Sequence, residues 1–172
     1  DAASGLRPRA SAVGGVVSLV RRPSDHVLAG CRPIGSGVRM SERWAEEFEL
    51  RARALWTDAA VRAVTEGKDL PILPSNAPTL LRALGLLHRD ASMPPPQVRK
   101  FLQLNHMIRL LRPPLLELIG RGEPLRIVDA GCGLSYLTLS LAWCFRHVFR
   151  HPASLLGIDR DEARVEAARA TV

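Results

Sequence analysis

An acid and two glycines stand at a spacing that suits the binding of a small ligand. Asp129 is followed by Gly131 and Gly133 at alternate positions. Glycine lets the backbone turn sharply and lets a ligand come close to the main chain, and the helix expected to follow would offer unpaired N–H groups at its start. The acid would repel a pyrophosphate at this turn. The stretch therefore predicts a ligand-binding turn, and a tight strand-to-helix turn with a capping acid is the purely structural alternative.

A strand and a helix would hold this turn in place. Residues 125–129 form a short apolar run that ends in the acid, and β-branched Ile127 and Val128 suit a buried parallel strand. Residues 134–145 are largely apolar and predict a buried helix. The order of strand, glycine turn and helix is typical of the opening of a nucleotide-binding α/β unit.

A second acid follows at the end of a second apolar run. Residues 153–159 predict another short strand that ends in Asp159, and residues 161–170 predict a helix with acids in its first turn. An acid at the end of a second strand can accept hydrogen bonds from both hydroxyls of a ribose. Dinucleotide-binding folds use the same arrangement, so Asp159 alone does not discriminate between cofactor classes.

The two motifs together separate two cofactor classes. A dinucleotide site would need the spacing G-x-G-x-x-G, but Tyr136 stands where the third glycine belongs. The run from Val128 to Gly133, followed by Gly-Ile-Asp at 157–159, resembles the class I S-adenosylmethionine-dependent methyltransferases. The resemblance covers roughly residues 97–171 and implies an α/β fold with a Rossmann-like sheet, of which only the first two strands are present here. It also implies S-adenosyl-L-methionine as the cofactor.

The resemblance further implies which residues meet the cofactor. Asp129 and the glycines would follow its methionine part, Asp159 would bind the ribose, and the guanidinium of Arg160 would stack against the adenine. Lys100-Phe101-Leu102-Gln103 matches a Lys-x-x-Gln pattern in a little-characterised methyltransferase-domain group, which places this helix near the cofactor mouth; a solvated helix face is the alternative. The implied cofactor-binding residues are Asp129, Ala130, Gly131, Cys132, Gly133, Tyr136, Asp159, Arg160 and Gln103.

Helices are predicted between residue 41 and the first of these strands. The first would run from Ser41 to near Gly67, with one apolar face formed by Trp44, Phe48, Ala52, Leu55 and Ala59. A short leucine-rich helix is predicted over residues 79–89 and a longer one over residues 97–111. Pro113 and Pro114 predict a break and a last short helix over residues 115–119.

The chain divides into three parts. Residues 1–39 are rich in Gly, Ala, Ser, Arg and Pro and predict a disordered tail or a non-native upstream segment, with Met40 as the natural start. Residues 40–120 form the helical extension, and residues 121–172 begin the cofactor-binding domain. The later strands, which hold the catalytic residues in the family, are missing, so we expect an N-terminal fragment that is inactive by itself and assign no catalytic residue.

The amino-acid composition favours some binding partners of the protein over others. The 172 residues carry a formal net charge of +7, almost wholly from arginine, which favours RNA over protein or a small molecule as the methyl acceptor. The apolar patch in residues 1–39 is too short to cross a bilayer, and the three cysteines have no zinc or disulfide spacing, which predicts a metal-free cytoplasmic protein. An NAD(P)-dependent oxidoreductase and a non-catalytic RNA- or protein-binding module of the same fold remain the alternatives.

Overall fold

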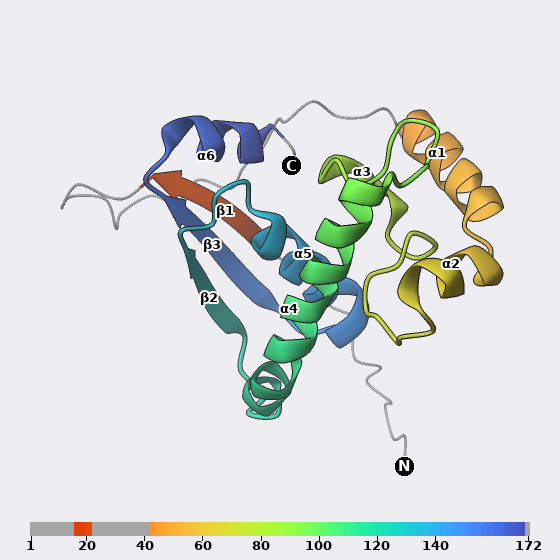
Figure 1. Cartoon of the computed structure of the whole chain (residues 1–172). Helices are drawn as coiled ribbons and strands as arrows, with labels where there is room; N and C mark the ends of the chain where they lie inside the picture. Colours follow the sequence, from red (N-terminus) through yellow and green to blue (C-terminus); the bar gives the residue numbers. More distant parts are fainter. Residues whose placement is uncertain (1–15, 22–41, 171–172) are drawn as a thin grey trace, which may run out of the picture.

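The computed structural model of the chain describes residues 16–21 and 42–170 (Figure 1). A parallel sheet lies on one side, α5 packs against it, and α4 and then α1 and α2 lie beyond (Figure 1). The elements in chain order are β1 (Val16–Arg21), α1 (Glu42–Leu55), α2 (Asp58–Thr65), α3 (Pro78–Ala83), α4 (Pro95–Ile119), β2 (Leu125–Ala130), α5 (Tyr136–Cys144), a π-helical turn η1 (Phe145–Phe149), β3 (Ala153–Asp159) and α6 (Glu162–Arg169).

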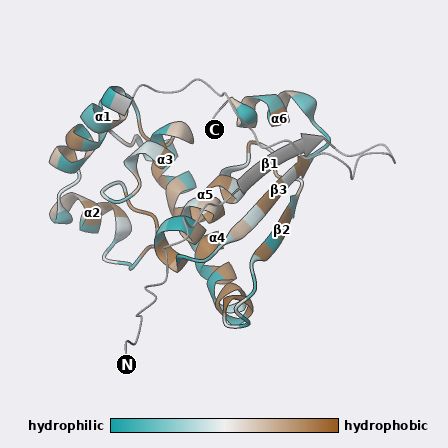
Figure 2. Cartoon of the chain, turned by 180° about the vertical axis from the view of Figure 1, so that it is seen from behind, coloured by the Kyte–Doolittle hydropathy of each residue, from teal (hydrophilic) through white to brown (hydrophobic). Residues whose placement is uncertain are grey.

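The sheet has the order β1-β3-β2, and both pairings are parallel. The strand–turn–helix–strand–helix order from β2 to α6 confirms the predicted α/β, Rossmann-like fold class. Apolar residues follow β2, β3 and α5, whereas α1 and α6 are mainly hydrophilic (Figure 2). Val128, expected to be buried, is 60 % exposed, because β2 lies at the edge of the described sheet and only alternate residues face the core.

β1 is a third strand that the sequence analysis did not predict. It lies within residues 1–39, where a tail or an upstream segment was expected, and pairs with β3 from Val16 opposite Ser154 to Arg21 opposite Asp159. Those six residues are therefore ordered as a strand, and the expectation of only two strands was wrong. The rest of residues 1–39, and the start at Met40, lie outside the described residues.

The predicted first helix is divided in two. α1 ends at Leu55, and α2 begins after Thr57, whose side chain caps it by accepting a hydrogen bond from the Ala60 N–H at 3.4 Å. Between them the buried Trp56 donates from Nε1 to the Ala91 carbonyl at 2.8 Å. The break turns Leu55 and Ala59 outward, so only Trp44, Phe48 and Ala52 of the predicted face contribute to the core.

α4 continues through the two prolines that were expected to interrupt it. A proline removes an N–H from the helix, which leaves the carbonyl four residues earlier without its helical partner. The carbonyls affected belong to Arg109 and Leu110, both exposed, so water can take the place of the lost donors. The last turns of α4 point in a different direction from the first ones (Figure 1), as expected for a helix bent at proline.

The main core lies between α1, α3, α4 and α5. Its largest fully buried side chains include Phe48, Leu81, Phe101 and Ile108. Asn105, also fully buried, donates from Nδ2 to the Phe101 carbonyl and accepts at Oδ1 from the Ile72 N–H, both at 3.1 Å. This amide fastens the connection between α2 and α3 to the middle of α4, and so fixes the helix that faces the glycine turn.

Candidate functional site

The glycine turn is fixed to the neighbouring strand by main-chain hydrogen bonds. Gly131 and Gly133 have φ angles of +84° and +56°, a region that glycine adopts readily and other residues rarely. The N–H groups of Gly131 and Cys132 both donate to the Ile158 carbonyl, at 2.7 and 3.1 Å. The turn therefore begins at the carboxyl ends of β2 and β3, where open α/β sheets bind their ligands.

Asp159 holds the second half of the turn. Its Oδ2 accepts from the Gly133 N–H at 2.7 Å, and its Oδ1 accepts from the Asp161 N–H at 2.9 Å. These two bonds, the one from Asp161 first, lower the pKa of Asp159 below its ordinary value of 3.8, and the charge of Arg164 adds to the effect. The carboxylate is therefore ionised at neutral pH and already bonded to the turn.

Asp129 is oriented by the helix that follows the turn. The buried Thr138 hydroxyl on α5 donates to Oδ2 of Asp129 at 2.6 Å. A short hydrogen bond to a carboxylate is about twice as strong as a neutral one, so the side chain is held at the end of β2. Thr138 was not predicted. It lies in the first turn of α5, and the sequence alone does not show where that helix starts.

Ser135 is a further residue that the sequence analysis missed. It is fully buried with a φ of +58°, and its hydroxyl has no hydrogen-bond partner among the described residues. Its N–H donates to the Cys132 carbonyl at 2.8 Å, so it closes the turn before α5. Gly131, Gly133 and Ser135 follow one another at alternate positions and each has a positive φ, but a serine gives no sequence signal for that conformation.

A cavity of about 380 Å³ lies between the turn and α4. It lies within the size range of ligand pockets. Five of the predicted cofactor residues line it, namely Gln103, Asp129, Gly131, Cys132 and Tyr136. The other lining residues are Lys100, Leu104, Met107, Leu134 and Leu137.

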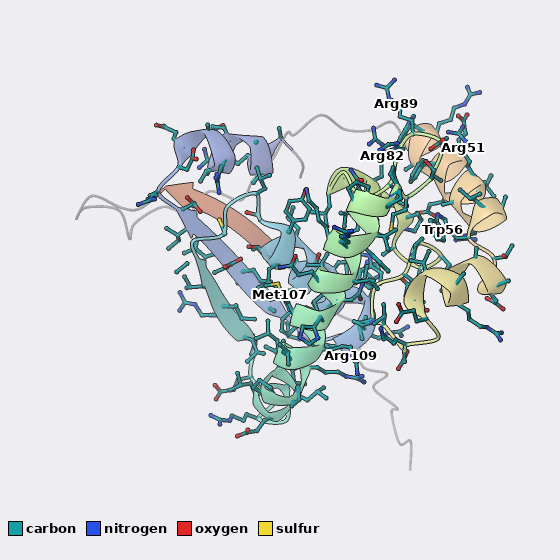
Figure 3. The ribbon with its side chains drawn as sticks, viewed as in Figure 1. Arg51, Trp56, Arg82, Arg89, Met107 and Arg109 are labelled. Carbon is teal, nitrogen blue, oxygen red and sulfur yellow. The ribbon has the colours of Figure 1, made fainter. Side chains whose placement is uncertain are left out.

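One face of α4 forms a wall of this cavity. Lys100, Gln103, Leu104 and Met107 follow the i, i+3, i+4, i+7 spacing that places residues on one side of a helix. Met107 lies on the side of α4 toward the sheet (Figure 3). The Lys-x-x-Gln pattern thus faces the cavity and is more than a solvated surface, although its role toward a ligand stays a prediction.

Four of the predicted residues do not line the cavity. Gly133 and Asp159 lie beside it and bond to each other, and Ala130 and Arg160 are exposed. The ribose role of Asp159 and the adenine role of Arg160 stay predictions. In the part of the chain that the structure describes, no cluster of His, Cys, Asp and Glu side chains could hold a metal ion, and no helix has the length and apolarity to cross a membrane.

The two described cysteines should differ strongly in reactivity. Burial raises the pKa of the Cys144 thiol to about 12, so only about one Cys144 in 10,000 is a thiolate at pH 8. Cys132 is half-buried and lines the cavity. In a Cys31→Ser variant, we expect iodoacetamide to modify Cys132 in the native protein and Cys144 only after unfolding, as read by peptide mass spectrometry. Equal rates for the two thiols would contradict the burial of Cys144.

Comparison with known proteins gives one finding for the part of the chain that holds this cavity. A family model described as a methyltransferase domain matches residues 99–172. The match contains the face of α4, the glycine turn and both strands that meet there, whereas α1, α2 and α3 lie outside it. Comparisons with curated proteins and with solved structures found no match. Residues 99–172 are therefore similar to a methyltransferase domain.

Proposed function

We propose that this chain binds S-adenosyl-L-methionine in the cavity between α4 and the glycine turn, as the cofactor site of a methyltransferase. The observation that carries the proposal is the set of groups around Gly131. Asp129 and Lys100 bring opposite charges to one cavity, and a Cβ atom added at Gly131 would meet no protein atom within 4 Å. A ligand can therefore approach the main chain between an anion and a cation.

The chemistry of the lining fits the cofactor. The amino-acid end of S-adenosylmethionine has an ammonium and a carboxylate, which match the charges of Asp129 and Lys100. Apolar walls from Leu104, Met107 and Leu137 suit the uncharged remainder of the molecule. When bound, this cofactor supplies a methyl group on a sulfonium for in-line displacement by an acceptor.

The residues of this chain would bind and orient rather than carry out proton transfer. Thr138 holds the Asp129 carboxylate at the end of β2, and Asp159 holds the Gly133 N–H, so the turn is arranged before a ligand arrives. No catalytic residue is assigned here. For the methyl acceptor we propose RNA, ahead of a protein or a small molecule, on the basis of the net charge of +7.

The experiment is a calorimetric titration of the chain with S-adenosylhomocysteine, and with NADH as the competing cofactor class. We expect S-adenosylhomocysteine to bind and NADH not to. Lys100→Gln should weaken binding about tenfold, because it removes one charge-assisted hydrogen bond. Arg99→Gln is the matched control: it removes one positive charge from the adjacent position of α4, which does not line the cavity, and should leave the affinity unchanged.

Each of the other outcomes of these titrations would favour a different interpretation. Binding of NADH alone would favour a nicotinamide-dependent oxidoreductase. Binding of neither ligand would favour a non-catalytic module with a methyltransferase-like fold. If Lys100→Gln and Arg99→Gln lowered the affinity for S-adenosylhomocysteine equally, Lys100 would act only through the net charge of the protein.

A further inference from the structure

A second cavity, of about 350 Å³, lies against a different side of α4. Its lining residues are Lys68, Asp69, Pro71, Arg109, Arg112 and Val148. At about 100° per residue, Arg109 is roughly 200° round the helix from Met107, and the two side chains leave α4 on different sides (Figure 3). The second cavity is therefore separate from the candidate cofactor site and shares none of its residues.

The lining of this second cavity is strongly basic. Three cationic side chains stand against one acid, Asp69. Lys68 pairs with Glu66 at 2.5 Å, but within the described residues no acid lies at ion-pair distance from Arg109 or Arg112. The two arginines are three residues apart on one helix, where like charges are mildly destabilising. Helix stability therefore does not account for them.

Other surface arginines that make ion pairs do so with an acid three or four residues away. Arg43 pairs with Glu47, Arg53 with Glu49, and Arg121 with Glu117, each four residues apart. Arg109 and Arg112 depart from this pattern, and both line the second cavity. An anionic ligand would neutralise such an excess of positive charge around a cavity.

The π-helical turn η1 contributes an apolar side chain to the same cavity. Val148 of η1 lines the cavity, and Arg146 and Arg150 lie two residues to either side of it. Three segments that are distant in sequence, at Lys68, at Arg109 and at Val148, thus surround one basic hollow.

We propose that this second cavity binds a backbone phosphate of an RNA strand. Guanidinium groups bind phosphate oxygens through two parallel hydrogen bonds, and an arginine pair on one helix can hold one phosphate or two successive ones. Lys100 and Arg112 are about 18 Å apart along α4, so a strand anchored at the arginines could reach round the helix toward the candidate cofactor site. The assignment of that strand as the methyl acceptor rests on the proposed function; phosphate binding itself does not.

The test is a fluorescence anisotropy titration of the whole chain with a short, labelled single-stranded RNA of mixed sequence, at several salt concentrations. We expect the double variant Arg109→Gln/Arg112→Gln to bind about tenfold or more weakly. The slope of log affinity against log salt should also become shallower by about 1.4, because each phosphate contact to a single strand contributes about 0.7. Lys68→Gln, in a loop, gives a second variant should the double variant fail to fold.

A control variant that loses the same number of positive charges elsewhere tests whether the effect is specific to the second cavity. Arg43→Gln/Arg53→Gln also removes two positive charges, but from exposed ion pairs on α1 that contribute little to stability. We expect this control to change RNA affinity less than threefold and to leave the salt slope as it is. If both double variants weaken RNA equally, or if neither does, the proposal is wrong.

Two additional measurements are needed. One distinguishes RNA from free phosphate as the ligand, and the other distinguishes this proposal from the proposed cofactor site. Inorganic phosphate at constant ionic strength should compete only weakly; full displacement of RNA at low concentration would mean that the site takes free phosphate, which overturns the RNA assignment. Calorimetry with S-adenosylhomocysteine on the Arg109→Gln/Arg112→Gln variant should match the parent chain. Loss of RNA binding with cofactor binding intact supports the RNA site, and it would do so even if the parent chain bound no cofactor.

Discussion

Replacing Gly131 by valine is expected to abolish the binding of S-adenosylhomocysteine while the chain stays folded. Gly131 has a φ of +84°, where a β-branched residue is strained by about 1–3 kcal/mol. The added side chain would meet no protein atom near its Cβ, so it would stand in the open space of the cavity. Binding should weaken more than a hundredfold by calorimetry, because the substituent occupies the volume that a ligand needs.

Gly122→Val separates this effect from backbone strain. Gly122 lies in the turn before β2 with a φ of +78°, and a Cβ there would also meet no atom within 4 Å, but it does not line the cavity. Urea denaturation should show a similar loss of stability in both variants, and calorimetry should show normal affinity for Gly122→Val. An equal loss of affinity in both would mean that strain, and not occupation of the cavity, disturbs binding.

Asn105→Ala is expected to lower the free energy of unfolding by about 3 kcal/mol. Asn105 is fully buried and bonds both to the Ile72 N–H and to the Phe101 carbonyl. Truncation would leave the Ile72 N–H buried without its acceptor and would open a small cavity beside Phe101. Urea denaturation measures the loss directly.

Asn76→Ala is the matched control for this change. Asn76 serves the same connection between α2 and α3, accepting from the Leu73 N–H at 2.8 Å and donating to the Pro71 carbonyl at 3.2 Å, but it is exposed. Water can replace those bonds, so the loss should be about 1 kcal/mol or less. If the two variants were equally destabilised, burial of Asn105 would not be the cause of its effect.

The strands and the turn of the candidate site could be predicted because their signals are local. An apolar run that ends in an acid marks both β2 and β3, and the glycine spacing marks the turn between β2 and α5. The Lys-x-x-Gln pattern was open to two interpretations, since a helix face shows its neighbours only after folding. The structure places Lys100 and Gln103 on the cavity because Asn105 and the core residues around it fix the rotation of α4.

The parts that could not be predicted depend on distant residues. α1 and α2 separate at Trp56 because its indole reaches Ala91, thirty-five residues later. α4 continues past Pro113 because the carbonyls that lose their donors face solvent, which propensity alone does not reveal. β1 is a short apolar run, but no acid or glycine turn follows it as in the cofactor unit, and its partner β3 lies far away in the sequence.

The order of the strands has a consequence for biosynthesis. Val16 leaves the ribosome long before Ser154, and β2 is also complete before β3, the strand to which both others bond. The central strand is thus the last of the three to be made, and until then neither outer strand has its partner. The helical residues between β1 and β2 make more local contacts, which form faster. We therefore expect the nascent chain to fold its helices first, while β1 remains available to chaperones until synthesis has passed Asp159.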